Sequence, residues 1–125
     1  IGFDRLFAEE IAKAYPHLSI TFCVRGAVTA NDATRADAQA VELPFPVVDN
    51  GCDIAGTELE RLGDEGREAF EQADVLISKG QANVETLLDT DHRYNVYYAF
   101  LVKCRRFIDR FGKAKLTPML VHDHK

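Results

Sequence analysis

Polar side chains that could bind a phosphate group follow an apolar stretch near the middle of the sequence. The segment VLIS, residues 75–78, is followed by Lys79 and Gly80 and then by the amides of Gln81 and Asn83. An ammonium beside a glycine at a helix start places positive charge next to backbone amides that a phosphate can approach. The two amides can hydrogen-bond phosphate oxygens or sugar hydroxyls. The alternative interpretation is a solvated lysine in a glycine turn.

A second polar cluster follows the apolar stretch at residues 18–24. Arg25 and Gly26 come first, and Asn31 and Asp32 follow. The planar guanidinium of Arg25 suits bidentate contact with a phosphate, although an ion pair explains it equally well. Asp32 is a hard oxygen ligand of the kind that Mg²⁺ or Mn²⁺ prefers, and the alternative is that Asp32 or Asn31 caps the next helix. The acidic partners considered for Arg25 are Asp49, Asp53 and Glu85.

The length and composition of the chain limit the classes of protein to which it can belong. The chain has 125 residues, 46% hydrophobic and 28% charged, which predicts a single domain of residues 1–125 with one core. The net charge of −5 comes without a long basic run, which argues against a nucleic-acid partner. No stretch approaches the roughly 20 apolar residues that span a bilayer, and no secretory signal opens the chain. We therefore expect a cytoplasmic protein without a membrane partner, and the sequence leaves its oligomeric state open.

The cysteines and histidines add little chemistry. The three cysteines share no CxxC spacing, which suggests reduced thiols, with Cys23 and Cys104 as core residues. No histidine can be placed beside a serine or cysteine, so a nucleophilic triad is unsupported. His122 and His124 alternate on a predicted strand and could bind a metal, or they could be a solvated terminus.

Helices and apolar strands alternate along the chain. The chain opens on a helical pattern at residues 3–14 with no methionine and no cap, from which we expect further chain upstream. A helix from Thr57, with Glu60 at capping-box spacing, is expected to break near Gly63. Strands this apolar are typical of a mostly parallel sheet buried on both faces between helices. The other predicted elements are strands at 18–25, 45–51, 73–80 and 115–122, and helices within 26–42, 81–90 and 93–112.

These elements place the polar clusters at one edge of the sheet. Ligands of open parallel sheets bind beyond the carboxyl ends of the strands, where loop amides and helix starts converge. The loops RGAVTANDAT, DNGCDIAGT and SKGQANVET each follow a predicted strand. We therefore expect an anionic metabolite to bind there.

The same segments resemble a known family. RGAVTANDAT at 25–34, AGTELERL at 55–62 and ADVLISKGQANVETL at 73–87 resemble the successive motifs of the metal-dependent damage-control phosphatases. That family was first catalogued as domain of unknown function family eighty-nine. The resemblance extends from IGFDRLFAEEI through YYAFLVKC. It implies a three-layer α/β/α Rossmann-like sandwich that hydrolyses phosphate monoesters of small metabolites, such as sugar phosphates, with a divalent metal (Mn, Mg, Co or Ni).

The resemblance also assigns roles to residues. It implies that Asp32 is a metal ligand and that Lys79 contacts the transferring phosphate. Two further ligands, an Asp-Asn pair in an Asp-Asn-x-Gly-Glu loop, are expected just upstream of Ile1. The pair at Asp49 and Asn50 is not that motif, because it precedes a different helix and lacks the Gly-Glu. The expected substrate-binding residues are Arg25, Gly26, Asn31, Gly80, Gln81 and Asn83.

We hypothesise in-line attack of water on a phosphoryl group. A metal held partly by Asp32 would polarise the phosphate oxygens, and Lys79 would neutralise their charge. One alternative is an aspartyl-phosphate enzyme, which needs an Asp-x-Asp loop where this sequence has NDATRAD. Another is a domain that binds phosphometabolites without catalysis.

Overall fold

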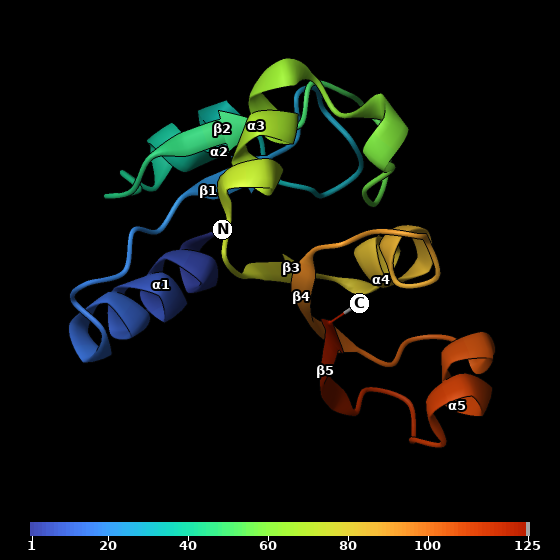
Figure 1. Ribbon diagram of the computed structural model, residues 1–125. Coiled ribbons are helices and arrows are strands. Elements are labelled where there is room, and N and C mark those ends of the chain that lie inside the picture. The colour runs from blue at the N-terminus through green and yellow to red at the C-terminus, as the bar shows by residue number, and fades with distance from the viewer. Residues whose placement is uncertain (125) are drawn as a thin grey trace. The chain divides into compact units, whose positions relative to one another are not determined.

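The chain folds into helices and short strands that divide into two compact units (Figure 1). The structure is a computed structural model that describes residues 1–124, without the side chain of His124. Unit 1 is Ile1–Asp53 with Arg61–Ala69, and unit 2 is Ile54–Glu60 with Phe70–Lys125. The single-domain prediction and the prediction of upstream chain remain predictions.

The observed elements follow the predicted order with one insertion. The helices are α1 (Gly2–Ala14), α2 (Arg35–Ala40), α3 (Asp64–Gln72), α4 (Gln81–Leu87) and α5 (Arg105–Phe111), with a short 3₁₀ turn at Leu59–Arg61. The strands are β1 (Phe22–Val24), β2 (Val47–Asp49), β3 (Leu76–Lys79), β4 (Asn95–Leu101) and β5 (Pro118–His124). The break predicted near Gly63 is confirmed, since it separates the 3₁₀ turn from α3.

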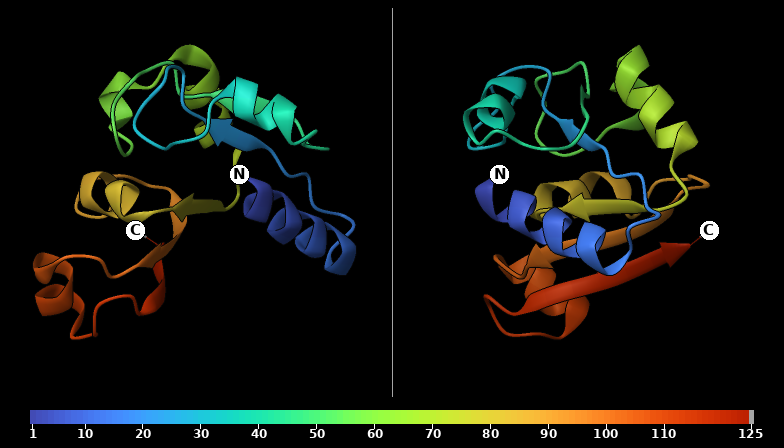
Figure 2. Two further views of the ribbon diagram at one scale, coloured as in Figure 1. Left: turned by 180° about the vertical axis from the view of Figure 1, so that it is seen from behind. Right: turned by 90° about the vertical axis from the view of Figure 1, so that its left-hand side faces the viewer.

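The strand pairs are mostly parallel, as predicted. In unit 1, β1 pairs with β2 in parallel and Cys23 lies opposite Val48. In unit 2, β4 lies between β3 and β5 (Figure 2). The β3 to β4 pair is parallel and the β4 to β5 pair is antiparallel. The fold is therefore mixed α/β, and the three-layer Rossmann-like arrangement remains a prediction.

The helix predicted over 93–112 is wrong in its first half, which is strand β4. Val96, Tyr98 and Phe100 alternate with more exposed neighbours, and this two-residue period belongs to a strand. The helix is confined to α5, which ends where predicted, at Gly112 in the left-handed conformation with φ of 62°. The prediction was mistaken because Phe100 also lies at helical spacing from Cys104, Phe107 and Phe111, so it was assigned to the same helix face.

The core of unit 2 lies on one face of β4. Buried side chains of α4 and α5 meet the alternate residues of that strand, and Figure 1 shows both helices on the same side of the sheet. The ring of Phe107 packs edge-on against Phe100, with centroids 5.7 Å apart. The buried cluster consists of Val84, Leu87, Val96, Tyr98, Phe100, Val102 and Phe107. The prediction that the strands are buried on both faces is wrong for β3, where Ile77 is 45% exposed.

Two further expectations about single residues are resolved. Cys104 packs against this core, as predicted, but Cys23 is exposed. Thr57 does not begin a capped helix, because its hydroxyl donates to Asn83 instead.

Within residues 1–124, no helix has the length and apolar character needed to cross a bilayer.

Candidate functional site

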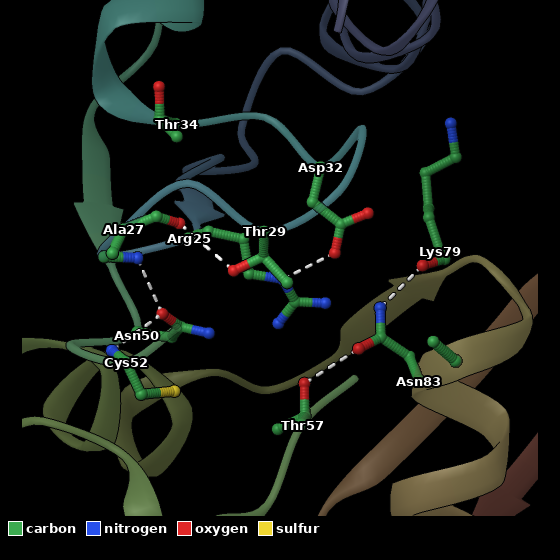
Figure 3. Close-up of polar contacts among 12 residues, drawn as sticks. Arg25, Ala27, Thr29, Asp32, Thr34, Asn50, Cys52, Thr57, Lys79 and Asn83 are labelled. Carbon is green, nitrogen blue, oxygen red and sulfur yellow. Dashed lines mark hydrogen bonds and ion pairs between the residues drawn. The ribbon is translucent and has the colours of Figure 1, made fainter. Parts of the chain in front are cut away.

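The loop after β1 folds back on itself through Arg25 and Asp32, both in unit 1. Arg25 Nε donates to Asp32 Oδ2 at 2.8 Å (Figure 3), and the Arg25 backbone N–H donates to Ala33. The Arg25 side chain is 11% exposed, whereas that of Asp32 is 42% exposed. The ion pair considered for Arg25 is therefore present with Asp32, and Asp49, one of the predicted partners, pairs with Arg35 instead. A largely buried guanidinium thus holds an accessible carboxylate at the carboxyl end of the strand.

Asp32 is not the cap of the following helix. The N-cap of α2 is Thr34, whose backbone N–H and hydroxyl both donate to Asp37 Oδ2, at 2.8 and 2.9 Å. These hydrogen bonds lower the pKa of Asp37. Asn31 is exposed in the loop and does not cap α2 either. The alternative that Asn31 or Asp32 is only a capping residue is therefore excluded.

Gly26 sits against the backbone of the loop after β2. A methyl group at Gly26 would lie 2.8 Å from Cys52 N and from Gly51 Cα. The side chain of Asn50 joins the two loops, because its Oδ1 accepts from Gly26 N at 2.8 Å and from Cys52 N at 3.2 Å. The glycine is therefore required for the close approach of these two strand ends.

Gly26→Ala is expected to lower the free energy of unfolding by about 1–3 kcal/mol, because the added methyl group overlaps backbone atoms that cannot move aside. Denaturant unfolding measures the change. Gly2→Ala is the matched control, since no atom lies within 4 Å of a Cβ built there. Equal stability of the two variants would contradict this account of the packing at Gly26.

The second polar cluster lies in unit 2, at the carboxyl end of β3. Lys79 is the last residue of the strand and pairs with Ala99 of β4. Gly80 has φ of 92°, a conformation that side chains rarely adopt, and its N–H donates to Ala99 O at 2.9 Å. The predicted approachable amide of Gly80 is thus already used within the sheet. What this turn presents to a ligand is the lysine side chain, which is exposed.

Both side-chain amides of this loop make internal hydrogen bonds. Asn83 Nδ2 donates to Lys79 O at 2.6 Å, and Asn83 Oδ1 accepts from the Thr57 hydroxyl at 2.9 Å (Figure 3). Gln81 Oε1 accepts from Lys103 N at 3.1 Å, and Gln81 Nε2 donates to Glu85 Oε1 at 2.8 Å. These amides hold the turn around Lys79, and their binding of sugar hydroxyls or phosphate oxygens remains a prediction.

A hollow of about 380 Å³ lies beside this turn. Lys79, Gly80 and Gln81 line one side, Lys103 adds a second ammonium, and Phe100 and Met119 are among its apolar residues. The sequence did not single out Lys103 as a site residue. Lys103 lies two residues after the end of β4, which runs parallel to β3, and the mistaken prediction of a helix over 93–112 hid this position.

The described residues supply one ligand for a metal and not a complete centre. Within residues 1–124, no group of three or more histidine, cysteine, aspartate or glutamate side chains could hold an ion. Asp32 fits a single ligand position, because Arg25 uses Oδ2 and leaves Oδ1 on an accessible carboxylate. His122 stacks on Tyr97 and its Nε2 lies 2.7 Å from Asn95 Oδ1, while the side chain of His124 lies outside the described part.

The predicted site residues thus fall into two local groups. Arg25, Gly26, Asn31 and Asp32 share one loop of unit 1, and Lys79, Gly80, Gln81 and Asn83 share one turn of unit 2. Sequence reasoning missed Asn50 and Thr57, which it assigned to a turn and to a helix cap. Only their partners, which are distant in sequence, show what they do.

Comparison with known proteins identifies the family. The family model described as Damage-control phosphatase ARMT1-like domain matches residues 1–116. An uncharacterized protein of Methanocaldococcus jannaschii is 34% identical over 116 residues, which cover 90% of this chain and 38% of the relative. A protein of Archaeoglobus fulgidus named damage-control phosphatase is 37% identical over 92 residues, which cover 71% of this chain and 31% of the relative.

Solved structures agree with the family model. The crystal structure of a DUF89 family protein from Pyrococcus horikoshii superposes with a TM-score of 0.86 at 27% identity, covering 96% of this chain and 42% of that one. The chain therefore spans less than half the length of the relatives it matches. With the family model matched along nearly the whole chain, and with its Arg-Gly and Lys-Gly loops placed at strand ends, this protein belongs to the damage-control phosphatase ARMT1-like (DUF89) family.

Proposed function

We propose that the full-length protein is a divalent-metal-dependent phosphatase that hydrolyses phosphate monoesters of small metabolites, such as sugar phosphates. The observation that carries this proposal is Lys79 at the carboxyl end of β3, held by Asn83 and Gly80 at the edge of a hollow that Lys103 also lines. Membership of a family whose relatives are named damage-control phosphatases supports it. Because those relatives are much longer, the activity is proposed for the whole protein.

The residues of this chain take electrostatic and positional roles. The Lys79 ammonium neutralises charge on the transferring phosphoryl group, whose equatorial oxygens carry most of the charge in the transition state. The backbone carbonyl of Lys79 accepts from Asn83, and Asn83 in turn accepts from the Thr57 hydroxyl. These bonds fix the backbone from which the lysine side chain extends. Arg25 Nε is committed to Asp32, so a contact of Arg25 with phosphate would use the terminal nitrogens.

Asp32 is proposed as one ligand of the divalent cation. A bound divalent cation supplies charge stabilisation for the phosphoryl oxygens. Arg25 orients the carboxylate through Oδ2, which leaves Oδ1 for coordination. A carboxylate is the ligand type that Mg²⁺ and Mn²⁺ prefer, and such sites often use few protein ligands.

The direct test is phosphate release by the full-length protein from a panel of sugar phosphates. The protein is first treated with a chelator and then supplied with Mn²⁺, Mg²⁺, Co²⁺ or Ni²⁺ in turn. We expect release from at least one ester with at least one metal, and none in the chelator. Absence of release under every condition would refute the proposed function, and equal release in the chelator would refute its metal dependence.

A further inference from the structure

Asn50 occupies a buried position where several segments of unit 1 meet. Its residue surface is 3% exposed, and it directly follows β2. Its backbone N–H donates to Val24 O at 2.9 Å, and its backbone carbonyl accepts from Gly63 N at 2.9 Å. The backbone of Asn50 is therefore fixed by the end of β1 and by the residue just before α3.

The orientation of the Asn50 amide is fixed by its neighbours. Oδ1 accepts from two backbone donors, Gly26 N and Cys52 N. A flipped amide would place its NH₂ group against those two N–H groups, which offer no acceptor. The NH₂ group must therefore point away from Gly26 and Cys52.

That NH₂ group lacks a hydrogen-bond acceptor within residues 1–124, although it is fully buried. Buried donors are nearly always paired in folded proteins, because an unpaired donor keeps the whole cost of leaving water. Figure 3 shows Nδ2 on the side of the amide that faces the Arg25 guanidinium. Since Nδ2 is a donor and lies beside a cationic group, the atom that satisfies it is an oxygen acceptor, and an anionic oxygen is the best match.

We propose that Asn50 Nδ2 donates a hydrogen bond to a phosphoryl oxygen of the substrate bound at the loop after β1. This inference rests on the proposed phosphatase function and adds a binding residue to it. Asn50 then has a double role, since Oδ1 positions Gly26 while Nδ2 contacts the ligand. The competing explanation is a buried structural water at Nδ2.

Asn50→Asp separates the two ends of the amide. The carboxylate keeps an acceptor for Gly26 and Cys52, but it turns the donor that faces the ligand into a negative oxygen. In the full-length protein we expect the dissociation constant of inorganic phosphate, measured by calorimetry, to rise at least about tenfold. KM for the best ester should rise similarly. Asn95→Asp is the matched control, because that amide already has partners in Asp74 and His122 and lies in unit 2.

A second measurement uses the wild-type protein, so it tests the proposal even if the Asn50→Asp variant does not fold. The side-chain amide protons of Asn50 are followed by NMR while inorganic phosphate is added, and we expect their signals to shift and saturate with the calorimetric affinity. Unmoved signals at saturating phosphate would overturn the proposal, as would unchanged phosphate affinity in a folded Asn50→Asp variant. Either result would assign Nδ2 to a structural water. Phosphate binding at Asn50 without ester hydrolysis would instead remove the proposed function and leave this inference standing.

Discussion

We expect Lys79→Met in the full-length protein to lower kcat by about 100- to 1,000-fold, the loss typical when one group that stabilises transition-state charge is removed. Lys79 lies at the end of β3, and its carbonyl accepts a hydrogen bond from Asn83, so its position in the turn is fixed. Methionine keeps the length and apolar body of the side chain and removes the charge. Initial rates of phosphate release over a range of substrate concentrations measure kcat and KM.

The control for Lys79→Met is Lys113→Met, which removes the same charge from an exposed lysine just after α5. Its kcat should match the wild type. Lys79→Arg keeps the charge but spreads it over a larger group, so its kcat should lie between those of wild type and Lys79→Met. Wild-type turnover in Lys79→Met would show that Lys79 is not part of the active site. A change in KM without a change in kcat would show that Lys79 contributes to substrate binding but not to the chemical step.

The position of Lys79 could be predicted because its signal is local. A short apolar run followed by lysine and glycine marks a strand end, and β3 ends at Lys79 as expected. Gly80 then adopts the positive φ for which glycine is suited. The same reasoning placed Arg25 and Gly26 directly after β1.

Strand β4 could not be separated from α5 by periodicity. Phe100 belongs both to the two-residue pattern with Val96 and Tyr98 and to a helical pattern with Cys104 and Phe107. Short apolar segments are ambiguous between strand and helix for this reason. The run of aromatic and β-branched residues at 96–100 was the available signal for a strand, and the helical spacing concealed it.

Capping signals proved ambiguous for a different reason. Thr57 and Glu60 have the spacing of a capping box, yet Thr57 bonds to Asn83, which is 26 residues away in the sequence. Thr34 and Asp37 have the same spacing and do begin a helix. Which side chains meet across distant loops is decided by tertiary packing, so neither the Thr57 contact nor the role of Asn50 could be predicted from local sequence.

Asp32→Asn is expected to lower Mn²⁺ affinity and to reduce turnover by about 100-fold or more in the full-length protein. The reason is that a neutral amide replaces the carboxylate that we propose as a ligand, and loss of metal stabilisation costs roughly 3 kcal/mol of transition-state binding. Electron paramagnetic resonance of added Mn²⁺ reports binding independently of turnover. Asp53→Asn, an equal charge change at an exposed residue of the same unit, should leave both quantities unchanged.

The ion pair of Asp32 with Arg25 makes a sharper test possible. If Asp32 is a metal ligand, Arg25→Met leaves its carboxylate in place without a competing cation, so Mn²⁺ affinity should be kept or increased. If Asp32 serves only to hold Arg25, then Arg25→Met and Asp32→Asn should have the same effect, and the double variant should be no worse than either. Mn²⁺ affinity that falls in Asp32→Asn but is kept or increased in Arg25→Met, which removes the 2.8 Å hydrogen bond to Asp32, supports the ligand role, and equal effects of the two substitutions refute it.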